Sequence, residues 1–271
     1  MAESLDFKDR FIGFQNTALL WNINSVKSLV QFSILSTQQE FCNTTIQKKL
    51  RLGKWIEVFT LFQLQQMDTV EILAENLQIK NNKQTIGEID LLLLQNELPI
   101  HLEIAYKFYL YDDLQTYLNP LDYWIGPNRN DSLSLKLKKL KDKQLPLLHK
   151  PETKTVLKTL GYESHQFEQF VNFKAQLFLP YHNQNIAFDT LNKACIKGFY
   201  IHFNEIELFR SYQFYIPNKL DWLVEPKLDV NWLSYNETVN VIERFMTKKQ
   251  SPLCWLKDKN NQLSKCFITW W

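Results

Sequence analysis

Two consecutive stretches decide the fold: Gly87-Glu88-Ile89-Asp90-Leu91-Leu92-Leu93-Leu94, and then His101-Leu102-Glu103-Ile104-Ala105-Tyr106-Lys107-Phe108. The unbroken leucine run of the first stretch is typical of a strand covered on both faces, so we expect two neighbouring buried strands. Side chains alternate between the faces of a strand, so Glu103 and Lys107 share one face of the second strand. Asp90 projects from the first strand. Carboxylates that face a common space repel each other unless a cation or hydrogen bonds compensate, and this pattern is typical of a functional site.

The bulk composition is that of a folded globular protein. Of the 271 residues, 45% are hydrophobic and 14% aromatic, which allows a sizeable core in one or two domains and excludes a disordered chain. The formal net charge is only +2, so any affinity for nucleic acid must come from local clustering of basic residues. One basic cluster is evident. Its lysines stand at positions 136, 138, 139, 141, 143, 150, 154 and 158.

The cysteines and the first residues indicate a cytoplasmic protein with free thiols. Cys42, Cys195, Cys254 and Cys266 are widely separated, and the chain does not open on a signal peptide. No apolar run approaches the roughly 18 residues that a membrane-spanning helix needs, so we expect no membrane partner. No histidine accompanies a cysteine at zinc-ligand spacing, and no Gly-rich phosphate loop is present.

The apolar pattern predicts one α/β domain over residues 1–271. The expected helices cover residues 1–50, a buried segment opening at Arg51, a segment capped by Asp131 or Ser132, and residues 236–247. The expected strands are 75–79, 84–94, 98–109, 172–180 and 196–208, and residues 251–271 should form a closing hairpin. No repeat and no linker rich in Gly, Pro or Ser divides the chain.

The order of polar residues along these elements resembles the PD-(D/E)XK nuclease superfamily. That order is a helix with Glu57, a strand with Asp90, a strand with Glu103 and Lys107, and a helix with Lys136 and Gln144. More closely, the chain is similar to the bacterial domain-of-unknown-function family 1853 over roughly residues 48–148. The motifs that carry this similarity are Arg51-Leu52-Gly53-x-x-x-Glu57, Gly87-Glu88-Ile89-Asp90, the stretch from His101 to Leu110, Gly126-Pro127-Asn128, and Gln144-Leu145-Pro146-Leu147.

The resemblance implies a restriction-endonuclease-like fold, with a mixed central sheet flanked by helices. The nuclease-like core would span residues 48–160, and residues 161–271 would add strands, a helix and the closing hairpin. The resemblance also implies Mg²⁺ or Mn²⁺ as cofactor and DNA or RNA as partner, because phosphodiester hydrolysis needs a divalent cation and an activated water. Asp90 and Glu103 would then be metal ligands, and Glu57 a further ligand or an acceptor behind them. Lys107 would stabilise charge at the phosphate.

The lysine departs from the superfamily pattern. The superfamily places it two residues after the acid, and Ala105 stands there. Lys107 lies on the same face but about 13 Å along the strand from Glu103, at about 3.3 Å per residue. Lys136, from the following helix, is an alternative donor. Gln144 falls on the apolar stripe of that helix, so we expect it to face either a buried partner or the site.

Three functions remain open from the sequence. The first is a metal-dependent phosphodiesterase. The second is a non-catalytic nuclease-like fold that binds nucleic acid or a protein, with the displaced lysine reflecting lost chemistry. The third is a structural protein whose acids form surface ion pairs. Under the first, the carboxylates of Glu57, Asp90 and Glu103 should converge on one point, and carboxylates splayed to opposite faces would exclude the metal site.

Overall fold

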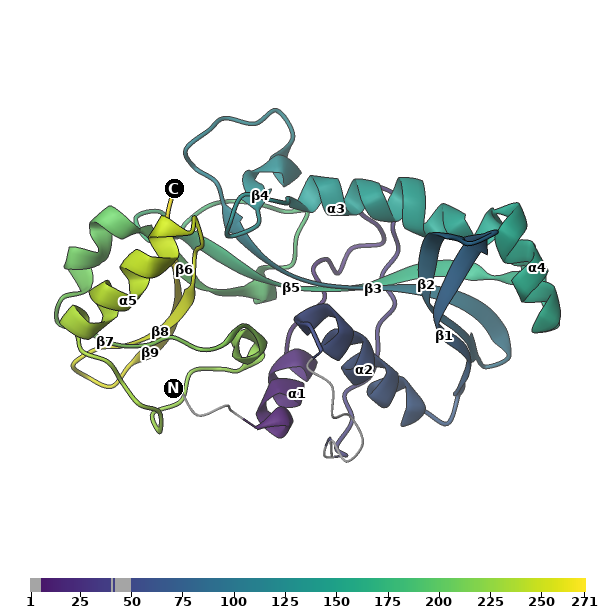
Figure 1. The fold of residues 1–271 in the computed structure, drawn as a ribbon, viewed down its shortest axis with the longest axis horizontal. Coiled ribbons are helices and arrows are strands. Elements are labelled where there is room, and N and C mark those ends of the chain that lie inside the picture. Colours follow the sequence, from purple (N-terminus) through teal and green to yellow (C-terminus); the bar gives the residue numbers. More distant parts are fainter. Residues whose placement is uncertain (1–5, 40, 42–49) are drawn as a thin grey trace.

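The computed structural model describes residues 6–39, 41 and 50–271. Its centre is one mixed nine-stranded sheet with helices on both sides (Figure 1). The strands are β1 Val70–Asn81, β2 Gln84–Gln95, β3 Leu98–Tyr111, β4 Trp124–Ile125, β5 Glu168–Pro180, β6 Ile196–His202, β7 Gln213–Tyr215, β8 Leu253–Lys257 and β9 Leu263–Thr269. The α-helices are α1 Phe7–Gln15, α2 Leu52–Gln65, α3 Leu133–Lys139, α4 Pro151–Thr159 and α5 Tyr235–Thr247. The expectation of a mixed sheet flanked by helices is therefore confirmed.

The sheet has an antiparallel meander at one end and a parallel centre. Its order is β1-β2-β3-β5-β6-β9-β8-β7, and the short β4 pairs with the end of β3. β1, β2 and β3 are joined by tight turns as antiparallel neighbours, whereas β3, β5, β6 and β9 run parallel. The β3–β5 ladder is long, from Ile100 beside Glu168 to Leu110 beside Phe178. The strand that carries Glu103 is thus held on both sides.

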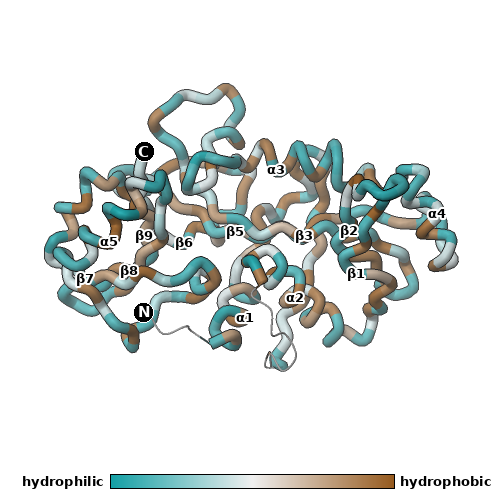
Figure 2. Tube along the Cα trace, viewed as in Figure 1, coloured by the Kyte–Doolittle hydropathy of each residue, from teal (hydrophilic) through white to brown (hydrophobic). Residues whose placement is uncertain are grey.

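Two apolar layers cover the middle of the sheet. On one side, α1 and α2 pack aromatic residues such as Phe11 and Phe59 against Leu102 of β3. On the other side, α3 packs Leu133 and Leu137 against Tyr109. Figure 1 shows α1 and α2 below the sheet and α3 above it. Figure 2 shows hydrophobic stretches within the strands, whereas the turn between β1 and β2 is hydrophilic.

The strand and helix predictions from residue 51 onward are largely confirmed. The helix opening at Arg51, the three strands of the meander, the helix capped by Ser132, the helix 236–247 and the closing hairpin all form. Ser132 caps α3 by accepting a hydrogen bond from the Leu135 backbone N–H. The strand expected over 196–208 ends at His202, where the Glu205 carboxylate accepts the His202 N–H and starts a 3₁₀ turn. That part of the prediction was wrong.

The helix expected over residues 1–50 is wrong for most of the described part. Only Phe7–Gln15 is helical, and residues 16–39 run irregularly beside the sheet. The reason lies in β5, which pairs with β6 only from Leu177 onward and so leaves its first half open on that side. The backbone N–H groups of Leu20 and Phe32 donate to carbonyls in this open part of β5. Hydrogen bonding to an open strand edge gives these backbone groups the partners that they would otherwise find within a helix. Residues 40 and 42–49, with Cys42, lie outside the described part.

Candidate functional site

The site begins where β2 and β3 separate. Their ladder runs from Gln95 beside Leu98 to Leu91 beside Leu102, and it stops before the next cross-strand pair, Asp90 and Glu103. Beyond this point β2 continues beside β1 alone. The Ile104 backbone N–H, which has left the ladder, donates instead to Oδ2 of Asp90 at 2.8 Å. The fork in the sheet therefore holds the Asp90 carboxylate beside the one on β3.

Glu103 is fully buried and is held by neutral donors. Its Oε1 lies 3.0 Å from Nε2 of His101, and its Oε2 accepts a hydrogen bond from the amide of Gln144. Burial lowers the pKa of His101 to about 4, so the ring is neutral near pH 7. Gln169 Nε2 lies 2.9 Å from His101 Nδ1 and also donates to the Leu145 carbonyl at 2.7 Å. This network places the ring proton on Nε2, facing the carboxylate.

Lys136 is a cation whose charge acts on both acids. It projects from α3, and its Nζ donates to Oε1 of Gln144 at 2.8 Å, so Gln144 links it to Glu103. Burial lowers the pKa of Lys136 to about 8, although the charges of Glu103 and Asp90 oppose the fall. The sequence predicts that Gln144 faces inward, toward a buried partner or the site. In the structure its amide has two partners: the oxygen accepts from Lys136 and the nitrogen donates to Glu103.

The two carboxyl groups titrate near neutrality. Burial, followed by the charge of Glu103, raises the pKa of Asp90 to about 7. Burial raises the pKa of Glu103 to about 7 as well, against the opposing charge of Lys136. Such a pair releases its protons in steps that belong to both groups together. At pH 7 the site therefore holds fewer than two full negative charges, and a cation would compete with the remaining protons.

Glu57 stands on the other side of the fork. It projects from α2, and its Oε2 accepts from Lys54 Nζ at 2.8 Å. Lys54 also contacts Oε1 of Glu88 at 2.6 Å and Oδ1 of Asn76 at 2.7 Å. Burial, with the nearby charge of Asp90, raises the pKa of Glu57. The charge of Asp90 therefore acts on Glu57, whereas the residue that Glu57 contacts directly is Lys54.

The structure brings together two of the three expected carboxylates more closely than the third. Within residues 6–39, 41 and 50–271, no group of three or more His, Cys, Asp or Glu side chains is gathered closely enough to hold a metal ion. Asp90 and Glu103 form the pair, and Glu57, from α2, lines the smaller cleft together with Asp90. Glu103 is fully buried and Asp90 is half-buried, so these two acids are not surface residues. Glu57 comes from α2, on the opposite side of the sheet from α3 (Figure 1), and the convergence of all three carboxylates on one point stays a prediction.

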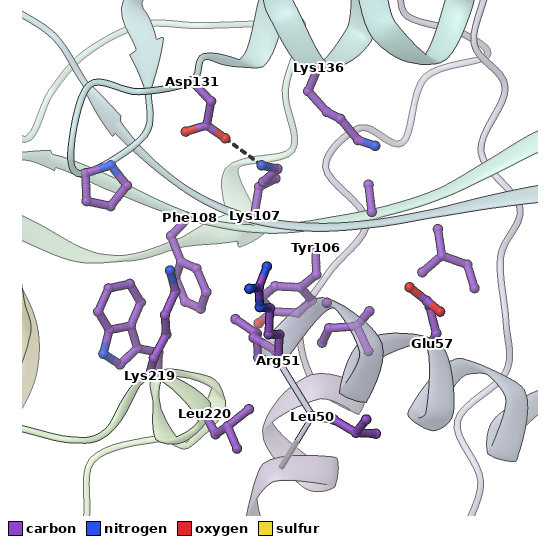
Figure 3. A pocket seen from close by; sticks show the side chains of 17 residues that line it. Leu50, Arg51, Glu57, Tyr106, Lys107, Phe108, Asp131, Lys136, Lys219 and Leu220 are labelled. Carbon is purple, nitrogen blue, oxygen red and sulfur yellow. Dashed lines mark hydrogen bonds and ion pairs between the residues drawn. The ribbon is translucent and has the colours of Figure 1, made fainter. Parts of the chain in front are cut away.

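Lys107 is occupied elsewhere. Its Nζ contacts Oδ2 of Asp131 at 2.5 Å, in the loop that leads into α3 (Figure 3). In the same view Lys136 reaches toward the sheet from above, and Glu57 points up toward it from α2. Of the two lysines weighed from the sequence, Lys136 is the one whose charge acts on both Asp90 and Glu103.

Two clefts meet at Glu57. The larger, of about 590 Å³, has four basic residues in its wall: Arg51, Lys107, Lys136 and Lys219. The smaller, of about 400 Å³, has four acidic ones: Glu57, Glu75, Glu88 and Asp90. Leu50 and Glu57 line both clefts. A cleft with mostly basic charged residues and a cleft with mostly acidic ones are thus joined at Leu50 and Glu57, and Asp90 lines the acidic one.

Several residues of this site have little signal in the sequence. His101 lies two residues before Glu103 on the same strand face, so its contact follows from strand alternation. Gln169 lies 68 positions from His101, and only the parallel β3–β5 register brings the two together. Lys219 lies in a 3₁₀ turn far along the chain. No local pattern marks either of the last two.

The rest of the basic cluster faces outward. Lys138, Lys139, Lys141 and Lys143 are exposed, and Lys138 pairs with Asp142 at 2.5 Å. Cys195, Cys254 and Cys266 are buried free thiols. No helix of the described residues is long and apolar enough to cross a membrane.

Comparison with known proteins gives one family and no individual relative. Neither the curated proteins nor the solved structures contain a match to this chain. One family model matches, and it covers residues 30–267, which is most of the chain and includes every residue of the fork. The chain therefore belongs to the family described as Domain of unknown function (DUF1853).

Proposed function

We propose that this protein is a metal-dependent phosphodiesterase of the PD-(D/E)XK type that acts on nucleic acid. The observation that carries the proposal is the buried Asp90–Glu103 pair at the β2–β3 fork, with Lys136 beside it. The order α2, β1, β2, β3, α3, β5, with β5 parallel to β3, supports it, because this is the element order of that nuclease core. An open fork of this kind places acids from two strands at one point.

The residues present fit a hard divalent cation. Mg²⁺ and Mn²⁺ prefer carboxylate, carbonyl and water oxygens and are commonly held by only one or two carboxylates with waters and substrate phosphate. The fork offers the two carboxylates of Asp90 and Glu103, and Glu57 lines the cleft beside Asp90. When bound, such a cation would supply Lewis-acid stabilisation of the phosphate and a water of lowered pKa. A cation would also relieve the repulsion that raises the pKa of Asp90.

The protein's own groups take the remaining roles. Gln144 fixes Oε2 of Glu103, and His101 fixes Oε1, so the carboxylate keeps one orientation. Lys136 is the group placed to stabilise negative charge that develops on a phosphate oxygen beside the acids, because Lys107 is paired with Asp131. We therefore assign to Lys136 the role that the sequence pattern gives to Lys107.

The test is a cleavage screen with single- and double-stranded DNA and RNA, with Mg²⁺ or Mn²⁺ and with chelator alone. We expect cation-dependent cleavage of at least one substrate, lost in Glu103→Ala and Asp90→Asn. Asp142→Asn is the matched control, because this acid is exposed and pairs with Lys138 on the outer face of the helix. Cleavage that survives in Glu103→Ala would refute the proposal.

A second candidate is a non-catalytic nucleic-acid binding module of the same fold. The observation that favours it is that Gln144 and His101 already satisfy both oxygens of Glu103, and Lys54 already pairs with Glu57. No cleavage and no cation response, together with salt-sensitive binding of nucleic acid, would favour this function over the first.

A further inference from the structure

We infer that the larger cleft binds an unpaired nucleotide of a single-stranded nucleic acid, with Arg51 and Lys219 holding its flanking phosphates and Trp222 stacking its base. This inference rests on the proposed function and names its substrate class. It makes Arg51, Lys219 and Trp222 positioning residues rather than catalytic ones.

The first observation is the charge of the cleft. Arg51, at the N-terminal end of α2, and Lys219, on a 3₁₀ turn, are both exposed, and both side chains lie in the cleft (Figure 3). Neither forms an ion pair with any other residue that the structure describes. Lys136 lines the same cleft closer to the acids. Cations from three separate elements therefore line one cleft, and few acids in that cleft neutralise them. Such a surplus of positive charge favours binding of a phosphate backbone.

The second observation is the aromatic wall. Trp222 lies on the same turn as Lys219, three residues further along, and Lys219 Nζ lies 5.5 Å from the centre of the Trp222 ring. Phe108 and Phe267 brace that ring edge-on, with centroid distances of 5.2 and 5.1 Å. Trp222 itself is only partly buried. A braced, partly exposed aromatic ring beside a cation is the arrangement that single-strand binders use to stack bases.

The third observation is how the turn is anchored. Asp221, between Lys219 and Trp222, is buried and accepts from Nε of Arg10 in α1 at 2.7 Å. The Trp222 carbonyl accepts from Gln176 and from the buried Lys265, each at 3.3 Å. The phosphate-binding lysine and the stacking ring are thus held on a fixed turn, which lowers the entropy cost of binding.

The fourth observation is size. A volume of about 590 Å³ lies within the range, about 300–1,000 Å³, of sites that enclose one small ligand. Bases in a duplex are stacked and paired, so an enclosing aromatic site can reach a base only in a single strand or after flipping. Lys136 lines this cleft, and its charge acts on both Asp90 and Glu103, so a nucleotide bound there would place its phosphate near the fork.

The test is fluorescence anisotropy in chelator, where no cation-dependent cleavage occurs. The probes are a short fluorescein-labelled DNA strand, the RNA strand of the same sequence, and the DNA duplex. We expect at least one single strand to bind about tenfold or more tightly than the duplex. Arg51→Gln and Lys219→Gln should each weaken binding and lower the salt slope by about 0.7. Lys259→Gln, in the exposed β8–β9 turn, is the matched control and should change neither.

The stacking role has its own readout. Trp222→Leu should weaken single-strand binding about 5- to 150-fold and leave the salt slope unchanged, whereas Trp222→Phe should restore most of the affinity. A thermal melt of each variant separates lost binding from lost folding, and the Phe variant keeps the test decisive if the Leu variant unfolds. Equal binding of duplex and single strand, or Arg51 and Lys219 variants that behave like the control, would overturn the inference. Cleavage could persist in that case, so the proposed function would stand or fall separately.

Discussion

At the scale of single residues, the fork is a balance between burial and charge. Glu103 is fully buried, and among the described residues its carboxylate has no arginine partner. A neutral His101 and a neutral Gln144 contact it, and the charge of a partly desolvated Lys136 acts on it. Neutral donors hold a carboxylate in place without cancelling its charge, so its affinity for a cation is kept. This arrangement suits a site that must accept an ion, and it makes the protein sensitive to pH.

Asp90→Asn should change how stability depends on pH. Raised pKa values mean that the native protein binds more protons than the unfolded chain between about pH 4 and pH 7, so the stability from these carboxyls is lost as the pH rises through about 7. Asparagine removes one titrating group and the repulsion on Glu103. Without added cation, we expect the difference in unfolding free energy between the variant and the wild type to change with pH. It should grow in favour of the variant by about 1–2 kcal/mol from pH 5 to pH 8. Urea unfolding at several pH values measures this, and a constant difference would contradict it.

Gln144→Ala should destabilise the protein. The substitution leaves Oε2 of Glu103 without its amide donor and removes an acceptor from Lys136. Loss of a buried partner costs about 1–3 kcal/mol. Chemical denaturation at pH 7 provides the measurement. Gln262→Ala, in the exposed β8–β9 turn, should cost less than about 0.5 kcal/mol; equal costs for the two variants would show that Gln144 has no special role.

The two lysines should differ in activity. Lys136→Met should lower single-turnover cleavage by about 10²- to 10³-fold, the usual cost of losing one donor to a developing charge. Lys107→Met should lower it much less, because that amine is paired with Asp131. A larger loss in Lys107→Met than in Lys136→Met would reverse our assignment of the lysine role.

At the scale of elements, the site depends on how β2 leaves β3 and how the turn with Trp222 is docked on α1. Gly13 of α1 lets this docking occur, because a Cβ there would lie 2.1 Å from the carbonyl oxygen of Leu223. The backbones of the two segments therefore touch where only a glycine fits. The fork thus forms where β2 diverges from β3. The wall of the larger cleft that carries Trp222 is positioned by the contact of its turn with α1.

Gly13→Ala should destabilise the protein and disturb the larger cleft. Relieving the clash requires a backbone shift of the turn, at a cost of about 1–3 kcal/mol. Gly53→Ala is the matched control, since nothing lies within 4 Å of its added Cβ and α2 gains a better helix former. We expect a lower melting temperature for the first variant and an equal or higher one for the second. A Gly13→Ala protein as stable as the wild type would show that the turn is not held as described.

Elements with a strong local pattern could be predicted from the sequence. The leucine run of β2, the amphipathic α5 and the capped α3 each carry their own signal, and each forms. The helix predicted after Gln15 does not form, because the backbone of that segment donates hydrogen bonds to the open edge of β5 instead. That edge exists only because β5 and β6 pair along a short stretch, which no local pattern reveals.

The same limit applies to the site. Asp90 and Glu103 could be placed together, because strand alternation and a short turn fix their relation. That Lys136 rather than Lys107 lies beside the acids depends on the salt bridge of Lys107 with Asp131 and on the fold of the helix after it. The contacts of Gln169 with His101, and the position of Lys219, depend on the register of distant strands and turns.

At the scale of the whole molecule, the charge is nearly balanced, and the proposed function depends on how that charge is distributed. A net charge of +2 gives no general attraction to nucleic acid. Most charged residues of the larger cleft are basic and most of those of the smaller are acidic; the two clefts share Glu57, and Asp90 of the fork lines the smaller one. A substrate phosphate and a cation would therefore approach the fork from different sides.

The most direct test of this account is a titration of Mg²⁺ and Mn²⁺ followed by thermal unfolding, with wild type and Asp90→Asn compared at about pH 6 and pH 8. A cation that binds only the folded protein raises the melting temperature, and it must displace protons from Asp90 and Glu103. We expect a clear increase for the wild type, larger at the higher pH because both carboxyl pKa values lie near 7, and none for Asp90→Asn. No increase at either pH, or an equal increase in both proteins, would contradict a cation site at the fork.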